Sequence, residues 1–96
     1  MGEKEIVRIT LRKDPLTQQA PLEVWGVELA SRGDALIVAD IAPGGAASCQ
    51  NRKVRWDHAK IKVGDNIISV NGVRYHARKM CREWNRSRTV HLVIER

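Results

Sequence analysis

The side chains that could support catalysis or metal binding are two cysteines and three histidines. They are Cys49, Cys81, His58, His76 and His91. A thiol beside an imidazole base can act as a nucleophile, and the same groups can bind zinc. However, no pair of them has the close spacing that is typical of structural zinc sites. We therefore interpret these residues as structural and predict neither a metal nor a cofactor.

Other signatures of catalysis are also missing from the sequence. It contains no glycine-rich phosphate loop, no nucleophile elbow and no paired carboxylates in a plausible cleft. Cys81 falls among apolar residues at helical spacing, and His91 lies within an alternating strand pattern, so both fit structural roles. We do not predict an enzyme.

One basic segment, residues 50–62, contains the residue types that bind anionic surfaces. Its positive side chains and its tryptophan are Arg52, Lys53, Arg55, Trp56, Lys60 and Lys62. Basic residues with an interleaved aromatic ring can bind phosphates or insert at a membrane interface. This segment suggests an alternative function, binding to an anionic membrane surface that contains phosphoinositides. Nucleic acid is a disfavoured partner, and an inert surface loop is the remaining interpretation.

The composition is that of one small domain. The chain has 96 residues, and 17 Lys and Arg against 11 Asp and Glu give a net charge of +6, which suits solubility as well as acidic partners. Phenylalanine is absent, so the core must be largely aliphatic. Two cysteines are too few for a disulfide scaffold, which favours a reducing compartment. No apolar run approaches the ~20 residues of a membrane-spanning helix. We expect a cytoplasmic domain that associates with membranes through its partners.

Periodicity divides the chain into strands and helices. Alternating or continuous apolar patterns predict strands over residues 6–13, 24–30, 35–41, 66–70 and 89–95, with turns at 31–34 and 71–72. A short helix is expected at 46–49, and a longer one carries an apolar stripe at Ala77, Met80, Cys81 and Trp84. The predicted fold is α+β, a partly open antiparallel barrel or sandwich of about five to six strands covered by a short and a long helix. We expect a single domain over 1–96, with its core at 5–95, that resembles a piece of a longer protein.

Trp25, Gly26 and Val27 stand where a loop becomes a strand. A glycine there lets the backbone approach a ligand closely and adopt angles that a side chain would forbid. The successive amide groups of these residues could form an anion-binding concavity for a terminal carboxylate. A free edge on the following strand could accept an extended peptide through main-chain hydrogen bonds. In the structural alternative, Gly26 is only a bulge and Trp25 is only a core residue.

The segment IKVGDNIISVNG at residues 61–72, followed by one amphipathic helix and a terminal strand, resembles the most recognisable part of the PDZ domain family. Upstream, IAPGGAA at 41–47 is similar to the family's third strand end and first helix start, and residues 25–27 are similar to its carboxylate-binding loop. The resemblance covers residues 5–95. It implies a PDZ-like fold and a scaffold or signalling module. Such a module binds the C-terminal peptide of another protein between the second strand and the long helix.

The resemblance also implies which residues form the peptide groove. They are Glu28, Leu29 and Ala30 on the strand and Ala77, Cys81 and Trp84 on the helix. The pocket for the ligand's last side chain, for which we expect Val, Leu or Ile, would be lined by Trp25, Val27, Leu29, Cys81 and Trp84. Arg78 and Arg82 are expected at the groove edge, where they would favour acidic ligand residues upstream of the terminus.

The register of the long helix decides the predicted specificity. If Ala77 opens the helix wall, Met80 faces the core. If His76 opens it, Lys79 takes the core-facing position, and burying an unpaired ammonium is costly. We therefore prefer Ala77. In the family, a histidine at this place accompanies Ser or Thr two residues before the ligand's end, and an apolar residue accompanies an apolar one. An apolar ligand residue is thus expected there.

Overall fold

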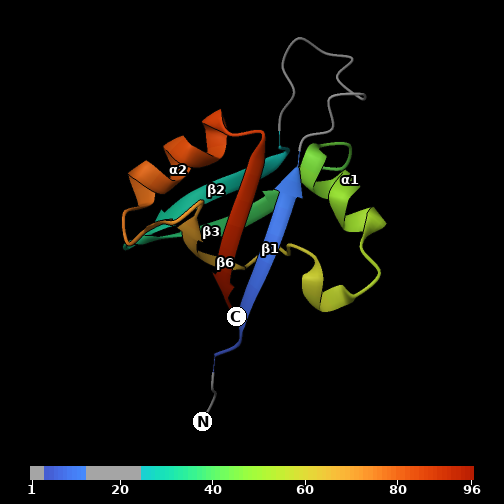
Figure 1. Ribbon diagram of the computed structural model, residues 1–96, viewed down its shortest axis with the longest axis horizontal. Helices are drawn as coiled ribbons and strands as arrows, with labels where there is room; N and C mark the ends of the chain where they lie inside the picture. The colour runs from blue at the N-terminus through green and yellow to red at the C-terminus, as the bar shows by residue number, and fades with distance from the viewer. Residues whose placement is uncertain (1–3, 13–24) are drawn as a thin grey trace.

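The computed structural model describes residues 4–12 and 25–96, which form six β-strands, two α-helices and a short 3₁₀ helix (Figure 1). In chain order, the elements are β1 (Ile6–Arg12), β2 (Val27–Arg32), β3 (Ala35–Ile41), α1 (Ala46–Lys53), the 3₁₀ helix η2 (Asp57–Ala59), β4 (Asn66–Val70), β5 (Val73–Arg74), α2 (Ala77–Arg86) and β6 (Thr89–Glu95).

The strands form one antiparallel sheet in the order β1-β6-β4-β3-β2, and the short β5 pairs with β4. Helix α1 packs against β1, and α2 packs against β2, β3, β4 and β5, so the two helices lie on opposite sides of the molecule (Figure 1). The predicted α+β class is confirmed. No helix within residues 4–12 and 25–96 is long and apolar enough to cross a membrane.

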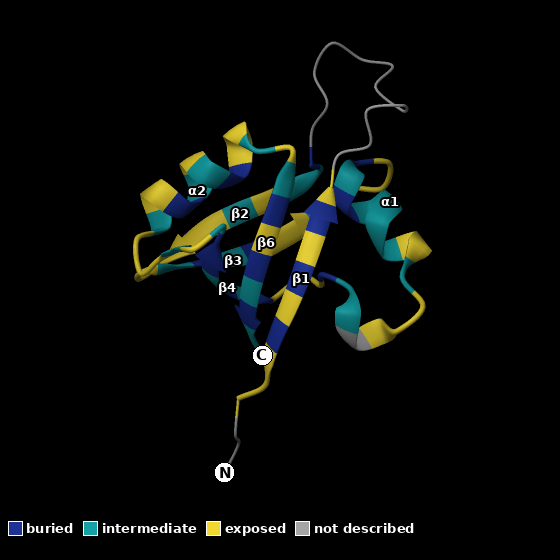
Figure 2. Cartoon of the chain, viewed as in Figure 1, coloured by how far each residue is buried: buried dark blue, intermediate teal, exposed yellow. Residues whose placement is uncertain are grey.

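Alternation along the strands places one face of the sheet in the core (Figure 2). In β1, Val7, Ile9 and Leu11 are buried while the residues between them are exposed, as the period-two pattern predicts. The core cluster is aliphatic apart from Met80 and two tryptophans. Burying one such side chain contributes about 1.5–3 kcal/mol, so this alternation drives the sheet to fold onto the core.

Strand β2 begins and ends later than predicted. It starts at Val27, because the φ angle of Gly26 is 72° and this left-handed conformation cannot belong to an extended strand. It continues past the predicted end at residue 30 to Arg32, which pairs with Ala35 around a tight turn. Residue 24, the predicted start of this strand, lies outside the described residues. Residue 13, the predicted end of the first strand, also lies outside them, and the structure describes β1 as far as Arg12.

Helix α1 is longer than the single turn predicted at residues 46–49. It continues to Lys53. The Asn51 side chain ties its last turn to the chain that enters β4: its Nδ2 donates to the Ile61 carbonyl over 2.8 Å, and its Oδ1 accepts from the Ile61 amide over 3.0 Å. The predicted basic segment 50–62 therefore contains the end of this helix, a connection and η2.

A buried ion pair attaches the last residue to the loop before β4. Arg96 Nε donates to Asp65 Oδ1 over 2.8 Å, and Arg96 Nη2 donates to Asp65 Oδ2 over 3.0 Å. The two side chains are only 17% and 5% exposed. The hydrogen bond that Arg96 donates to the Asp65 carboxylate raises the pKa of Arg96. This pair keeps the end of the chain next to the sheet, and the sequence analysis did not anticipate it.

Candidate functional site

Strand β2 lies at one end of the sheet and pairs only with β3 among the described strands. On its other side lies helix α2, which packs against it (Figure 1). A strand in this position presents backbone N–H and C=O groups that its own sheet does not use. The edge of β2 together with the adjoining face of α2 is the candidate functional site, and we call it the β2–α2 site.

The hydrogen bonds between β2 and β3 show which backbone groups face this edge. The Ala42 amide donates to the Gly26 carbonyl over 2.7 Å. This bond flanks the opposed residues Val27 and Ile41, which identifies them as a non-hydrogen-bonded pair of the antiparallel ladder. The N–H and C=O groups of Val27 therefore point away from β3, toward the open edge.

Leu29 has the same orientation for an independent reason. Its partner on β3 is Val38, whose amide donates to the Asp65 carbonyl over 3.0 Å and whose carbonyl accepts from the Gly64 amide over 2.8 Å. Both the N–H and the C=O of Val38 are therefore bonded on the side of β3 that faces away from β2. Val38 thus bonds neither the N–H nor the C=O of Leu29. Although the β2–β3 register shifts between Glu28 and Leu29, the backbone groups of Val27 and Leu29 thus both face the open edge and form a row there.

The side chains of β2 divide between its two faces. Val27 and Leu29 are half-buried and pack against the core cluster, whereas Glu28 and Ala30 are exposed. Of the groove residues predicted on this strand, Leu29 therefore lies beside the core together with Val27, whereas the side chains of Glu28 and Ala30 lie on the outer face.

The loop before β2 packs closely against the start of α1. A Cβ atom on Gly26 would lie 2.8 Å from the Gly45 Cα, and one on Gly45 would lie 2.6 Å from the Gly26 Cα. The Trp25 carbonyl accepts from the Ala47 amide over 3.0 Å. In a trans peptide the C=O and the next N–H point in opposite directions, so the Gly26 amide points away from α1. No acceptor in the described part of the chain bonds this amide.

Trp25 and Trp84 form a buried pair beneath this loop. Their ring centroids are 5.5 Å apart at an interplanar angle of 53°, and Trp25 Nε1 donates to the Trp84 carbonyl over 2.9 Å. The two residues are only 4% and 2% exposed. Although both were expected to line the terminal-residue pocket, they offer almost no surface to a ligand. They support the loop from below, and Val27, Leu29 and Cys81 provide the partly exposed apolar surface.

Helix α2 begins at Ala77. His76 caps it, because its Nδ1 accepts from the Lys79 amide over 3.2 Å. Lys79 is exposed, whereas Met80 is fully buried, as expected when Ala77 rather than His76 opens the helix wall. Ala77 and Cys81 are half-buried and pack at the margin of the core cluster.

The positive charge of α2 is only partly compensated. Arg86 Nε donates to Glu83 Oε2 over 2.8 Å, and this hydrogen bond raises the pKa of Arg86. Arg78 and Arg82 are exposed and pair with no carboxylate among the described residues. Their charge is available to attract an acidic ligand.

The basic segment 50–62 lies away from the β2–α2 site, on the side of α1. Arg52 and Lys53 belong to the last turn of that helix, and Arg55 and Trp56 follow it. Trp56 is 63% exposed. The remaining two basic residues of this segment are Lys60, which is half-buried, and Lys62.

One of these basic residues is compensated within the segment. Lys62 Nζ lies 2.6 Å from Asp57 Oδ2, and the resulting hydrogen bond holds the pKa of Asp57 below its ordinary value. The segment therefore presents less net charge to a partner than its composition indicates.

The described residues contain no cluster of three or more His, Cys, Asp or Glu side chains that could hold a metal ion. Sequence reasoning missed the role of Gly45, because IAPGGAA at 41–47 indicated only the end of a strand and the start of a helix. Its contact with Gly26 joins residues that are far apart in the chain. A glycine pair of this kind becomes visible only once the fold is known.

Comparison with known proteins gives the family. The PDZ domain family model matches residues 16–95. The crystal structure of MUPP1 PDZ4 matches the fold with a TM-score of 0.66 and 19% sequence identity, over 100% of this chain and 80% of that chain. None of the curated proteins compared with the chain matches it. Because the family model spans most of the sequence, the chain belongs to the PDZ domain family, whose members are protein-interaction modules and generally not enzymes.

Proposed function

We propose that the β2–α2 site captures the extended C-terminal tail of a partner protein. The carrying observation is the row of Val27 and Leu29 backbone groups that face away from β3. An added peptide strand would hydrogen-bond to this row, which contributes affinity, while its alternate side chains would contact α2, which contributes specificity.

The terminal carboxylate would bind where this row meets the Trp25-Gly26-Val27 loop. Two carbonyls of the loop, those of Trp25 and Gly26, are bonded toward Ala47 and Ala42. Each of the next amides, those of Gly26 and Val27, therefore points away from these partners, and two adjacent N–H groups that the loop does not use suit a carboxylate. The contact of Gly26 with Gly45 fixes this orientation before the ligand arrives.

The side chains around the site define the proposed specificity. Val27, Leu29 and Cys81 would contact an aliphatic terminal residue, and Ala77 would face an apolar residue two positions before it. Arg78 and Arg82 lie one position beyond Ala77 and Cys81 on the exposed side of α2, where they would favour acidic residues further upstream.

A peptide array with matched termini tests this proposal. Each peptide is presented with a free and with an amidated C-terminus, so that only the negative charge differs. Binding should require the free carboxylate and should select aliphatic terminal residues. Binding that survives amidation would contradict carboxylate capture by the Trp25-Gly26-Val27 loop.

A second candidate function is docking on an anionic membrane surface through the basic segment. It is favoured by Trp56, which is 63% exposed beside the exposed Arg52, Lys53 and Arg55. An exposed tryptophan flanked by basic residues can insert at a lipid interface. Co-sedimentation with phosphatidylserine vesicles should fall when Arg52, Lys53 and Arg55 are replaced by glutamine, while peptide affinity stays unchanged. Equal sedimentation of the variant would exclude this function.

A further inference from the structure

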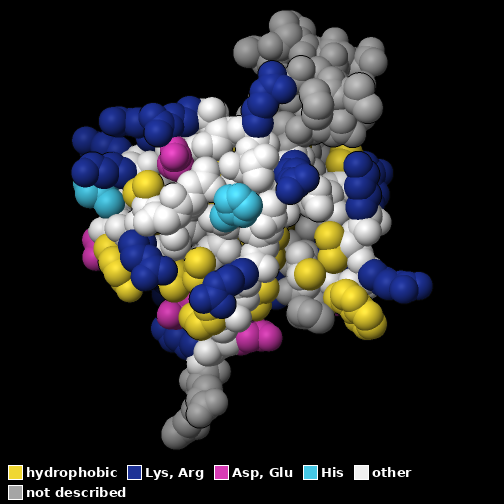
Figure 3. Space-filling model, viewed as in Figure 1, with side chains coloured by type: hydrophobic (Ala, Val, Ile, Leu, Met, Phe, Trp, Pro, Cys, Tyr) yellow, Lys and Arg dark blue, Asp and Glu magenta, His cyan; other side chains and the backbone are white. Residues whose placement is uncertain are grey.

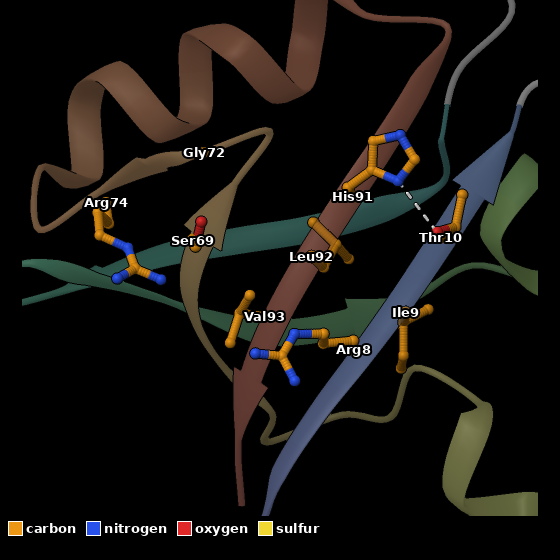
Figure 4. A pocket seen from close by; sticks show the side chains of 9 residues that line it. All are labelled: Arg8, Ile9, Thr10, Ser69, Gly72, Arg74, His91, Leu92 and Val93. Atoms are coloured by element: carbon orange, nitrogen blue, oxygen red, sulfur yellow. Dashed lines mark hydrogen bonds between the residues drawn. The ribbon is translucent and has the colours of Figure 1, made fainter.

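A cavity of about 350 Å³ lies on the outer face of the sheet, across β1, β6, β4 and the turn to β5 (Figure 4). Its polar lining comes from Arg8, Thr10, Ser69, Arg74 and His91. None of these residues belongs to the β2–α2 site or to the basic segment 50–62. The cavity is therefore a separate feature that peptide capture does not explain.

The sheet register places one arginine on each side of this cavity. Arg8 of β1 is opposite Val93 of β6, Val93 is opposite Ser69 of β4, and Ser69 is opposite Arg74 of β5. Neighbouring strands are about 4.8 Å apart, so these four residues form one row across the sheet with an arginine at each end. In Figure 4, the Arg8 guanidinium turns toward Val93 and the Arg74 guanidinium lies on the side of Ser69.

The charge of these arginines is not neutralised within the described residues. Neither Arg8 nor Arg74 forms an ion pair there, although the Arg74 guanidinium lies 5.7 Å from the centroid of the Tyr75 ring. Glu95, two residues after Val93 on β6, pairs with Lys4 over 3.0 Å. Figure 3 shows this face of the molecule, with Lys and Arg side chains around a central histidine. The cavity is thus a positively charged site.

The cavity also contains hydroxyl groups suited to an anion. Ser69 is only 3% exposed, yet its hydroxyl forms no hydrogen bond with the described residues. This hydroxyl is not among the buried side-chain atoms that lack a partner, so it reaches the cavity surface, where it can donate to a ligand oxygen. On the adjacent row, Thr10 Oγ1 and His91 Nδ1 lie 3.1 Å apart (Figure 4), which orients these two side chains toward each other.

We propose that this cavity binds a phosphate monoester carried on a small polar molecule. A phosphate monoester has three acceptor oxygens and a charge of about −1.5 to −2, which two guanidinium groups can balance. A carboxylate offers only two oxygens and a single charge, so it would use fewer of the donors. The cavity volume of about 350 Å³ lies within the usual range for small-molecule sites. A free phosphorylated polyol and the same group on a lipid share this chemistry.

Titration with inositol trisphosphate, with unphosphorylated inositol as the control, tests the proposal. Calorimetry gives the affinity, and ¹H–¹⁵N spectra of the labelled chain locate the site. Only the phosphorylated molecule should bind, and the shifts should centre on Ser69, Arg74 and His91. Replacing Arg8 and Arg74 by glutamine should lower the affinity at least about tenfold. The control variant replaces Arg32 and Arg88, which are exposed and lie outside the cavity, by glutamine. It removes the same amount of charge and should change the affinity for inositol trisphosphate little.

The Ser69→Ala variant separates binding from folding. Because the hydroxyl bonds no described protein group, its loss should leave the unfolding temperature unchanged and still weaken inositol trisphosphate binding several-fold. Failure of the intact chain to bind inositol trisphosphate would overturn the proposal. So would an equal loss in the Arg32 and Arg88 variant, or shifts confined to residues 50–62.

Vesicles distinguish the two sources of the phosphate group. Phosphatidylcholine vesicles with and without phosphatidylinositol bisphosphate are sedimented with the intact chain and with the Arg8 and Arg74 variant. Sedimentation that needs both the phosphorylated lipid and the two arginines identifies a headgroup, whereas binding of inositol trisphosphate without sedimentation identifies a free phosphate ester. Peptide affinity should be the same in both proteins, so failure of this proposal is distinguishable from failure of peptide capture.

Discussion

Gly26 and Gly45 bring the backbones of the loop before β2 and the start of α1 into direct contact. A Cβ atom on either glycine would lie within 2.8 Å of the other's Cα. The two residues differ in one respect: Gly26 has a positive φ of 72°, whereas Gly45 has an ordinary extended conformation. Gly45 is therefore needed only for the space that it leaves to the loop.

The Gly45→Ala substitution should displace this loop. The added methyl group would lie 2.6 Å from the Gly26 Cα and from the Trp25 carbonyl oxygen, so the backbone must move. We expect a loss of about 1–3 kcal/mol in the free energy of unfolding, as for other overpacked sites. We also expect weaker binding of free-carboxylate peptides, measured by fluorescence anisotropy.

The matched control is Gly33→Ala in the β2–β3 turn. Gly33 has a φ of 61°, but no atom lies within 4 Å of its added Cβ. Its substitution should cost about 1–2 kcal/mol of stability through backbone strain and leave peptide affinity unchanged. Equal affinity losses in the two variants would show that stability alone, and not loop geometry, controls binding.

Removing the Arg96 guanidinium should destabilise the fold. In Arg96→Met, the carboxylate of Asp65, which is 5% exposed, loses a partner that binds it through two hydrogen bonds. Leaving a buried charge unpaired costs about 3 kcal/mol or more, which urea unfolding measures as a lower midpoint at a constant slope. Lys4→Met removes an exposed ion pair and should cost less than about 1 kcal/mol. Similar losses in both variants would refute a special role for the buried pair.

The Ala77→His substitution should change the peptide specificity. Ala77 is the first residue of α2 and is half-buried beside the core cluster. An imidazole there can hydrogen-bond to a ligand hydroxyl, which an alanine cannot do. A peptide library should then shift from apolar residues toward Ser or Thr two positions before the C-terminus. An unchanged profile would show that Ala77 does not face the ligand at that position.

Salt should weaken the binding of acidic peptides more than that of neutral ones. Arg78 and Arg82 are exposed, so added ions screen their attraction for a ligand carboxylate. Titrations at low and high salt should show this difference for the intact chain and should show it reduced when both arginines are replaced by glutamine. Arg88→Gln is the charge control, because Arg88 lies after α2. A salt effect that persists without Arg78 and Arg82 would place the acidic contact elsewhere.

Most of the elements could be predicted because they depend on local patterns. The alternation of Val90, Leu92 and Ile94 fixes both the strand and its buried face, and Asn71-Gly72 marks a turn that the structure contains. The start of β2 was predicted less accurately. It depends on the positive φ angle of Gly26, a residue that packs against the distant Gly45.

Features that join distant residues escaped the sequence analysis. Helix α1 continues past its predicted turn to a segment in which Asn51 bonds to the distant Ile61, and Arg96 is held by Asp65. The outer cavity is of the same kind. Arg8, Ser69 and Arg74 meet only because the registers of three strand pairs bring them into one row.

The most direct test of the central claim is a ¹H–¹⁵N titration of the labelled chain with a free-carboxylate peptide that ends in an aliphatic residue. Strand addition at the β2 edge gives the amides of Val27 and Leu29 new acceptors, and carboxylate capture does the same for Gly26. We predict that these three amides shift most and become protected from hydrogen exchange, with no such effect from the amidated peptide. Changes confined to α1 or to residues 50–62, with Val27 and Leu29 unaffected, would contradict the account.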